Sequence, residues 1–205
     1  MFEKTWCKNH KKKKGEYLVF GNGLNSFISP KKKQLNAGNS GTLARILTGM
    51  LATNSDFKVK IYGDQSLNKR DMARIIKPLS KIGCTFMPYN KKTLPLIVRG
   101  TDFGLAQHHV LSSGSAQSKA CILMAAMNLP GITTIEERNL SRNHSELILR
   151  SIGADIQINK TKKYNLITMR GQQNLKKFSL NIPGDPSSSA FFIALTLLSK
   201  GSKLK

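Results

Sequence analysis

The sequence predicts an α/β (α+β) fold built from repeated βαβαββ units, and three observations support this prediction. Small polar residues lead into an apolar helix at three places, near Gly41-Thr42, Ser115-Ala116 and Ser188. Thr42, Ser115 and Ser188 follow one another at intervals of 73 residues, the length of a supersecondary unit rather than of a solenoid repeat. Strand and helix patterns also follow in a similar order after the first two openings.

In the first half of the chain, the predicted strands and helices alternate until two strands close the unit. In chain order they are a helix at 42–52, a strand at 57–62, a helix at 71–82, and strands at 85–89 and 94–99. The strand predicted before them, at 16–20, looks like the end of an earlier repeat. In the helix at 71–82 the apolar residues recur at the i, i+3, i+4 and i+7 positions of one helical face. Pro78 inside this helix favours a kink, and Gly83 is suited to end the helix.

The second half repeats this order of elements. They are a strand at 109–111, a helix at 116–128, a strand at 132–136, a helix at 144–152, and strands at 155–159 and 166–169. Ile82-Gly83 and Ile152-Gly153 occupy equivalent places, 70 residues apart. A further copy opens with a predicted strand at 179–182 and a helix at 187–198.

The formal net charge of +22 over 205 residues favours either nucleic-acid binding or a basic enzyme that acts on phosphates. Much of the charge comes from lysines within 11–14, 31–33, 160–163 and 176–177, which fall where the pattern predicts turns. These segments lack the interleaved aromatic residues of a base-stacking surface. We therefore expect solvated loops with weak, salt-sensitive affinity for polyanions and no specific nucleic-acid site.

The three cysteines, Cys7, Cys84 and Cys121, lie far apart and form no Cys-x-x-Cys pair. This spacing indicates neither a disulfide framework nor a zinc site, and it favours a reducing cytoplasm. We expect Cys84 and Cys121 to be packed thiols, because both lie in apolar segments. No apolar run approaches the ~20 residues of a membrane helix, and no membrane association is expected.

Six motifs occur in order along the chain. They are Leu-Asn-Ala-Gly-Asn-Ser-Gly-Thr-x-x-Arg (35–45), Gly-Asp-x-Ser-Leu-x-Lys-Arg (63–70), Ser-Ala-Gln-x-Lys (115–119), Pro-Gly-Ile-Thr (130–133), Ser-Arg-Asn-His (141–144) and Pro-Gly-Asp-Pro-Ser-Ser (183–188). From about residue 15 onward, the chain resembles the 3-phosphoshikimate 1-carboxyvinyltransferase family, also called 5-enolpyruvylshikimate-3-phosphate (EPSP) synthase. The resemblance implies the enolpyruvyl transferase fold, an inside-out α/β barrel of βαβαββ units, here incomplete.

The resemblance also implies a division of the chain. Residues 1–35 would end the first unit, 36–108 would form the second, 109–182 the third, and 183–205 would begin a second domain. Residues 1–14 match nothing in the family pattern. The family's opening Lys-Ser-x-x-x-Arg segment and most of its second domain, which carries the acid–base residues, are not found here. We therefore expect a fragment or truncated product, inactive by itself, with no catalytic residue assigned within it.

The implied activity is that of a transferase. The enolpyruvyl (1-carboxyvinyl) group of phosphoenolpyruvate would pass to the 5-hydroxyl of shikimate 3-phosphate with release of phosphate, a step of chorismate and aromatic amino acid biosynthesis. No cofactor or metal is implied, and the full-length protein would be a monomer. Both substrates are polyanions, and convergent helix N-termini and guanidinium groups suit the binding of such charges.

Site residues follow from the motifs by this resemblance. Phosphoenolpyruvate would bind Gly41, Arg70 and Gln117, and shikimate 3-phosphate would bind Ser115, Ala116, Gln117 and Arg142. Gly41 leaves room for an anion at its N–H, and Arg70 suits bidentate binding of phosphate. Ser115 could also cap its helix, since one hydroxyl can serve both roles.

For a second group of candidate site residues, the sequence leaves the role of the side chain open. They are Asn39, Thr42, Arg45, Lys119, Ser141 and Asp185. Asn39 and Thr42 suit helix capping as well as ligand contact, and Arg45 suits an internal salt bridge. Lys119 would add charge to the site. Asp185 would either help to form the site or cap the helix that begins near residue 187.

Three other functions stay open at this point. UDP-N-acetylglucosamine 1-carboxyvinyltransferase shares the repeated unit, but its reactive loop cysteine has no counterpart among Cys7, Cys84 and Cys121. RNA 3′-terminal phosphate cyclase has related units, but its nucleotide motifs are not visible here. A non-catalytic, basic polyanion-binding remnant is the third alternative.

Overall fold

The computed structural model describes residues 8–13, 15–27, 30–54 and 57–204. The chain divides into two compact units, residues 1–175 and residues 176–205. The first unit contains all ten strands and five helices of the described part of the chain, and the second contains one helix. No helix in these described ranges is long and apolar enough to cross a membrane.

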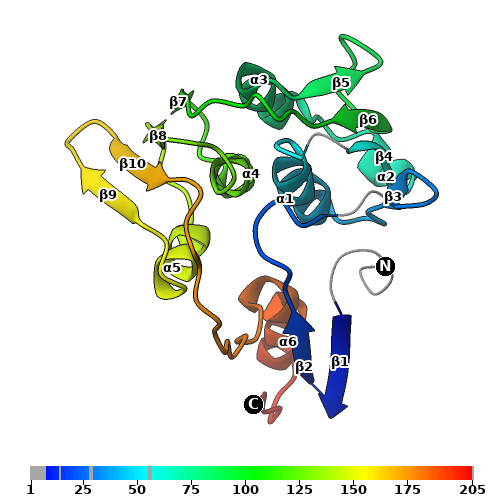
Figure 1. Cartoon of the computed structure of the whole chain (residues 1–205). Helices are drawn as coiled ribbons and strands as arrows, with labels where there is room; N and C mark the ends of the chain where they lie inside the picture. Colours follow the sequence, from blue (N-terminus) through cyan, green and yellow to red (C-terminus); the bar gives the residue numbers. More distant parts are fainter. Residues whose placement is uncertain (1–7, 14, 28–29, 55–56, 205) are drawn as a thin grey trace. The chain divides into compact units, whose positions relative to one another are not determined.

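The first four-stranded sheet has the strand order β3-β4-β6-β5 (Figure 1). Its strands are β3 (Gln34–Asn36), β4 (Lys58–Tyr62), β5 (Thr85–Met87) and β6 (Leu96–Arg99). β3 and β4 are parallel, whereas β4 pairs with β6 and β6 with β5 in antiparallel fashion. Helix α1 (Gly41–Leu51) joins β3 to β4, and the helices α2 (Gln65–Asn68) and α3 (Ala73–Ile82) join β4 to β5.

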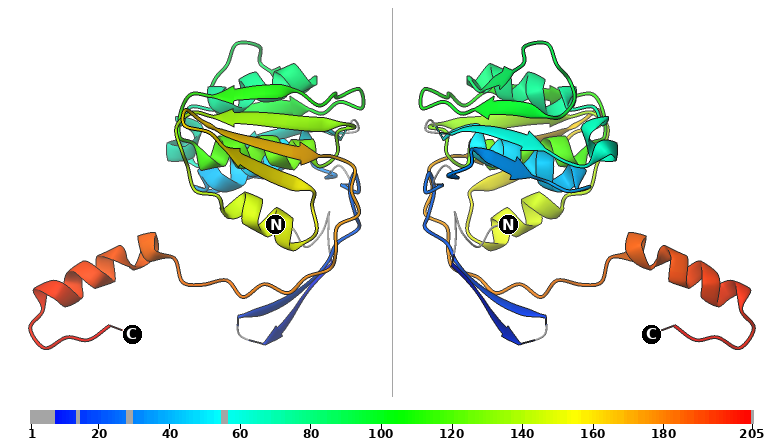
Figure 2. Two further views of the ribbon diagram at one scale, coloured as in Figure 1. Left: turned by 90° about the vertical axis from the view of Figure 1, so that its left-hand side faces the viewer. Right: turned by 90° about the vertical axis from the view of Figure 1, so that its right-hand side faces the viewer.

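The second four-stranded sheet repeats this topology, with the order β7-β8-β10-β9. Its strands are β7 (His108–Leu111), β8 (Ile132–Glu137), β9 (Ile156–Lys160) and β10 (Asn165–Arg170). Again the first pair is parallel and the other two are antiparallel. Helices α4 (Ala116–Ala126) and α5 (His144–Ser151) occupy the places of α1 and α3. Figure 2 (left) shows β8, β10 and β9 side by side. The predicted repeat of βαβαββ units is therefore confirmed.

Most predicted elements agree with the structure to within three residues at their ends, but two elements of the first sheet were not predicted. These are the strand β3 and the short helix α2, which Asp64 caps by accepting a hydrogen bond from Leu67 N at 2.8 Å. The helix predicted at 71–82 begins only at Ala73, because Asp71 forms a bridge with Thr93. Pro78 lies inside α3, and Gly83 ends it with a φ of 110° as expected.

Two predictions about local structure are wrong. The lysines at 11–13 lie in a strand rather than a turn, because β1 (Lys8–Lys13) pairs antiparallel with β2 (Glu16–Phe20). Residues 179–182 form no strand, because they pair with no neighbouring strand in the described part of the chain. The helix that follows them, α6 (Pro186–Leu198), matches its predicted range within one residue.

Helices α1 and α4 form the tightest contact between helices in the first unit, and they lie side by side in Figure 1. A Cβ atom built on Gly49 of α1 would lie 2.2 Å from the backbone oxygen of Cys121 in α4. Only a glycine allows this close approach of the two backbones. The side chains of α4 belong to both cores: Cys121 and Ala125 lie in the core of the first sheet, and Ile122 and Leu123 lie in the core of the second.

Glycines at equivalent positions join the last strand of each sheet to these helices. A Cβ on Gly100 would lie 2.1 Å from Asn54 O after α1, and one on Gly171 would lie 1.9 Å from Leu129 O after α4. These positions are 71 residues apart. The same kind of backbone contact therefore fixes the C-terminal end of α1 in the first βαβαββ repeat and of α4 in the second.

The described cysteines are packed thiols, as predicted. Cys84 and Cys121 are free and buried. Burial raises the pKa of Cys84 to about 12, and burial also raises that of Cys121. Cys7 lies outside the described residues.

A Gly49→Ala substitution tests the α1–α4 contact. Alanine is favoured in a helix by about 1 kcal/mol, whereas forcing packed backbones apart costs about 1–3 kcal/mol or more. Because the Cβ would lie only 2.2 Å from a backbone oxygen, we expect a cost of about 2–3 kcal/mol and so a net loss of about 1–2 kcal/mol in the free energy of unfolding, measured by urea denaturation. Gly21→Ala is the control, because a Cβ there meets open space. An unchanged or raised stability of Gly49→Ala would show that the helices are not in close contact.

The burial of His109 in β7 predicts that the fold loses stability at acid pH. Its side chain is 2% exposed, and burial, with the nearby Lys81 and His108, lowers its pKa to about 4 from an ordinary value of 6.5. Between pH 6.5 and pH 4 the unfolded chain binds a proton at His109 that the folded chain does not. The free energy of unfolding therefore falls as the pH drops through this range, by up to about 3 kcal/mol in total.

Urea titrations of wild type and His109→Gln at pH 7 and pH 5 measure this effect. We expect the variant to lose less stability than wild type between the two pH values. His144→Gln, at an exposed position at the start of α5, is the control and should keep the wild-type difference. Equal pH dependence of wild type and His109→Gln would contradict the assignment.

Candidate functional site

The N-terminus of α1 is capped by Ser40, not by Asn39 or Thr42. Ser40 Oγ accepts a hydrogen bond from Leu43 N at 3.1 Å. Asn39 and Thr42 therefore keep their side chains free for other contacts, and the capping alternative considered for them from the sequence is wrong. The N–H groups of the first turn start at Gly41, which has no side chain to cover them.

Two arginines converge on Gly41. A Cβ atom built there would lie 2.9 Å from Arg45 Nη1 and 3.3 Å from Arg70 Nη1. Burial, followed by the nearby cations Arg70 and Arg74, lowers the pKa of Arg45. Two guanidinium groups and a helix N-terminus thus concentrate positive charge at one point, which favours the binding of an anion.

Arg70 is held in place through Asn39 and Asp64. Arg70 Nη2 donates to Asn39 Oδ1 at 3.1 Å, and Asn39 Nδ2 donates to Asp64 Oδ2 at 2.5 Å. Hydrogen bonds from Leu67 N–H and from Asn39 lower the pKa of the Asp64 carboxyl. The cap of α2 therefore also orients the arginine, through a single amide side chain.

Arg45 joins the N-terminal turns of the two central helices. Its Nη1 donates to Gln117 Oε1 at 2.6 Å, and its Nη2 donates to the backbone oxygen of Asp71 at 2.9 Å. Gln117 Nε2 in turn donates to Thr42 Oγ1 at 2.8 Å. Gln117 therefore meets Arg45 and Thr42 in one polar cluster, although it lies 72 and 75 positions after them in the sequence. In that cluster Arg45 contacts an amide and a carbonyl rather than the carboxylate of the salt bridge considered from the sequence.

The N-terminus of α4 carries the other half of the predicted site. Ser115 caps this helix by accepting hydrogen bonds from Ser118 N at 3.3 Å and from Ser118 Oγ at 3.0 Å. Ala116 begins the helix, and Ser115, Ala116 and Gln117 are all half-buried. The predicted capping role of Ser115 is confirmed, and the opening turn remains partly accessible to solvent.

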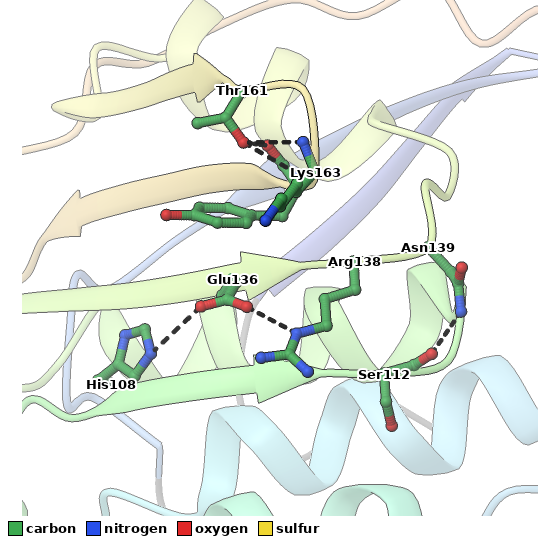
Figure 3. Close-up of polar contacts among 8 residues, drawn as sticks. His108, Ser112, Glu136, Arg138, Asn139, Thr161 and Lys163 are labelled. Atoms are coloured by element: carbon green, nitrogen blue, oxygen red, sulfur yellow. Dashed lines mark hydrogen bonds and ion pairs between the residues drawn. The ribbon is translucent and has the colours of Figure 1, made fainter.

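The loop after β8, residues 138–143, lies against the segment that leads into α4. The side chain of Asn139 donates a hydrogen bond to the backbone oxygen of Ser112 (Figure 3). A Cβ on Gly114 would lie 3.1 Å from Leu140 O. Ser141 donates to Glu137 Oε1 from its backbone N at 3.1 Å and from Oγ at 2.5 Å. Arg142 follows directly and is exposed. The structure thus brings the loop that carries Arg142 to the segment that carries Ser115.

The sequence suggested that Lys119 adds charge to the site, but its side chain is buried. Its side chain is 1% exposed, and its Nζ lies 3.0 Å from Glu137 Oε1 and 2.7 Å from Glu146 Oε1. The two glutamate side chains are 3% and 2% exposed. Lys119 therefore neutralises buried carboxylates behind the site instead of adding a free cation to it.

Asp185 lies in the second unit, where it caps α6. It accepts hydrogen bonds from Ser187 N at 2.9 Å and from Ser188 Oγ at 2.6 Å, and these contacts lower its pKa. The capping alternative for Asp185 is therefore confirmed.

A second polar cluster lies on the outer surface of β8 and is separate from the candidate site. Glu136 lies between Arg138, which donates to it at 2.7 Å, and His108, whose Nε2 is 4.0 Å away (Figure 3). His108 and Arg138 are more than half exposed, so this ion pair contributes little to stability. In the described part of the chain, no three His, Cys, Asp or Glu side chains gather as a metal site would require.

Sequence reasoning did not single out three residues that organise the site. These are Asp64, Glu137 and Glu146. Asp64 stands in the Gly-Asp-x-Ser-Leu motif, so its pairing with Asn39 was within reach of a motif-based search. Glu137 and Glu146 gave no such signal, because an acidic residue in a strand or helix usually faces solvent.

The family model described as EPSP synthase (3-phosphoshikimate 1-carboxyvinyltransferase) matches residues 2–205, so the expectation that residues 1–14 match nothing in the family is wrong. Proteins named 3-phosphoshikimate 1-carboxyvinyltransferase from Novosphingobium aromaticivorans and Granulibacter bethesdensis are 39% and 40% identical to 93% of this chain. A solved EPSP synthase from Acinetobacter baumannii is similar with a TM-score of 0.80, at 33% identity over 95% of this chain.

The chain is much shorter than these proteins. The aligned region is 43% and 42% of the two curated relatives and 43% of the solved chain. The similarity therefore concerns less than half of each relative, and it includes every residue of the polar cluster around Gly41 and Gln117.

A double-mutant cycle tests the link between α1 and α4. Gln117→Ala removes the amide that joins Arg45 to Thr42, and we expect it to cost at least about 1 kcal/mol of unfolding free energy. Combined with Arg45→Met, it should show a coupling energy of at least about 0.5 kcal/mol in urea denaturation. Gln157→Ala, at an exposed position of β9, is the control and should not couple with Arg45→Met. Additive losses for Gln117→Ala and Arg45→Met would disprove the contact.

Proposed function

The chain belongs to the EPSP synthase family, and from this premise we propose that its residues bind phosphoenolpyruvate and shikimate 3-phosphate for enolpyruvyl transfer. The reaction would move the 1-carboxyvinyl group to the 5-hydroxyl of shikimate 3-phosphate and release phosphate. The proposal for this chain concerns binding, because the chain spans about 43% of its relatives' length. The names of the relatives favour this family over the sister enzyme and the RNA cyclase.

In this proposal, phosphoenolpyruvate binds at the N-terminus of α1. Gly41 leaves its N–H open, and the guanidinium groups of Arg45 and Arg70 lie within 3.3 Å of where a side chain would stand. A carboxylate or phosphate at that point would meet two cations and a helix N-terminus. Asn39 keeps Arg70 oriented toward this point, since its amide accepts from Arg70 and donates to Asp64.

Shikimate 3-phosphate would bind at the N-terminus of α4. Ser115 and Ala116 offer a hydroxyl and a free backbone N–H at the start of the helix, and the loop with Ser141 and Arg142 lies against the same segment. Arg142 is exposed and would supply the charge that a dianionic phosphate requires.

One observation carries the proposal. Gln117 bonds both to Arg45 of the phosphoenolpyruvate half and to Thr42 beside Gly41, while standing two residues after Ser115. The two proposed subsites therefore share a side chain and lie next to each other, as a transfer between two bound substrates requires.

We also infer the division of the chain from the repeated topology. The proposed units are 36–108 and 109–182, with 1–35 as the end of an earlier unit and 183–205 as the start of a further domain. Equal strand orders in the two sheets support the two middle units. Monomeric state at full length and a reducing compartment remain part of the proposal.

Calorimetry with shikimate 3-phosphate tests the second subsite. Wild type should bind in 150 mM salt, which suppresses non-specific attraction to the chain's +22 charge. Arg142→Ala should weaken binding at least ten-fold, about 1.4 kcal/mol. Arg170→Ala, an exposed arginine paired with Asp155, is the charge-matched control and should bind as wild type does. Equal losses in both variants would indicate general attraction to a basic surface, and the proposal would fail.

Calorimetry with phosphoenolpyruvate tests the first subsite. Gly41→Ala places a methyl group 2.9 Å from Arg45 Nη1, where side chains can shift, so the fold should persist while the anion loses its place. We expect at least a ten-fold weaker affinity, and the same for Arg70→Ala. Arg99→Ala, at an exposed position of β6, is the control. Retained phosphoenolpyruvate binding in Gly41→Ala and Arg70→Ala would place the donor elsewhere.

A further inference from the structure

We propose that Lys119 is a positioning residue for the phosphate-binding loop: through Glu137 it holds Ser141 and Arg142 against the N-terminus of α4. The consequence for shikimate 3-phosphate rests on the function proposed above. Lys119 belongs to a buried cluster of charged side chains that lies behind the proposed binding residues.

The cluster contains three charged side chains, none more than 3% exposed. Lys119 comes from α4, Glu137 from the end of β8 and Glu146 from the first turn of α5. Lys119 Nζ lies 2.7 Å from Glu146 Oε1 and 3.0 Å from Glu137 Oε1. One ammonium thus ties together the three elements that surround the loop.

Such a cluster is not the most stable filling for a core. Desolvation offsets much of the attraction in a buried ion pair, and apolar residues of similar volume often serve stability as well or better. Here two carboxylates share one cation, and Glu146 Oε2 accepts no hydrogen bond from any residue that the structure describes. Stability alone therefore does not account for the choice of these residues.

Glu137 shows what the cluster does. Its Oε1 accepts from Ser141 N at 3.1 Å and from Ser141 Oγ at 2.5 Å, while the same oxygen faces Lys119. The carboxylate thus fixes both the backbone and the side chain of the residue before Arg142. Asn139, which bonds to Ser112 O, fixes the other end of the same loop.

Lys119 would affect the binding of shikimate 3-phosphate without touching it. Lys119 lies one helical turn beyond Ser115, so its ammonium sets the distance between the α4 N-terminus and the loop. A phosphate held between Ser115 and Arg142 depends on that distance, whereas a ligand at Gly41 and Arg70 does not. Loss of the cluster should therefore weaken one substrate selectively.

The first arm of the test is calorimetry of both ligands with Lys119→Met, which keeps an unbranched apolar side chain one atom shorter and removes the charge. We expect shikimate 3-phosphate to bind at least ten-fold more weakly and phosphoenolpyruvate to change less than two-fold. Equal weakening of both ligands would mean that Lys119 only supports the fold, and unchanged shikimate 3-phosphate affinity would mean that it positions nothing. Either result overturns the proposal.

The second arm needs no ligand and covers the case in which Lys119→Met does not fold. Amide hydrogen exchange of Ser141 and Arg142 is measured by NMR in wild type, Glu137→Gln and Glu136→Gln. Glu136 is the matched control, since it is the adjacent residue of β8 and its carboxylate pairs with the surface residues His108 and Arg138. Exchange at Ser141 should speed up at least ten-fold in Glu137→Gln and stay unchanged in Glu136→Gln.

The two arms separate the possible failures. If wild type binds neither ligand, the proposed function fails, and the exchange measurement still decides whether the cluster anchors the loop. If wild type binds both ligands and exchange at Ser141 is the same in Glu137→Gln and wild type, the positioning role of the cluster is refuted.

Discussion

The backbone contact between α1 and α4 is the constraint on which the rest of the structure depends. At Gly49 the helices approach so closely that a single methyl group would overlap the Cys121 carbonyl. That approach brings the two helix N-termini to the same level, so that Arg45 can reach Gln117 and Gln117 can reach Thr42. The candidate site is therefore a product of helix packing: its polar residues meet because an interior glycine, about one turn from Arg45 and two turns from Thr42, lets the helices touch.

Most of the fold was predictable because its signals are local. Helix α3 showed its apolar face in the sequence, and Gly83 and Gly153 ended helices as their residue type suggests. The failures came from segments whose state depends on a partner. Residues 8–13 are a lysine-rich strand only because β2 pairs with them, and residues 179–182 look like a strand but find no partner among the described residues. The composition of one segment does not determine whether another strand pairs with it.

For the site, the motifs located the binding groups but not their supports. Gly41, Arg45, Arg70 and Gln117 were predicted from short patterns, and the structure brings all four together. Lys119 was also singled out, but its burial could not be foreseen, because the two carboxylates that balance it come from β8 and α5. A charged residue reveals its role only when the groups that neutralise it are known, and these are set by tertiary structure.

The double membership of α4 has a consequence for how the first unit folds. Cys121 and Ala125 belong to one core, and Ile122 and Leu123 belong to the other, so neither sheet can complete its interior without the same helix. Although the chain repeats a unit, the repeats are not independent folding modules. Heat or denaturant should melt both sheets in a single cooperative transition, since releasing α4 from one exposes the apolar surface of the other.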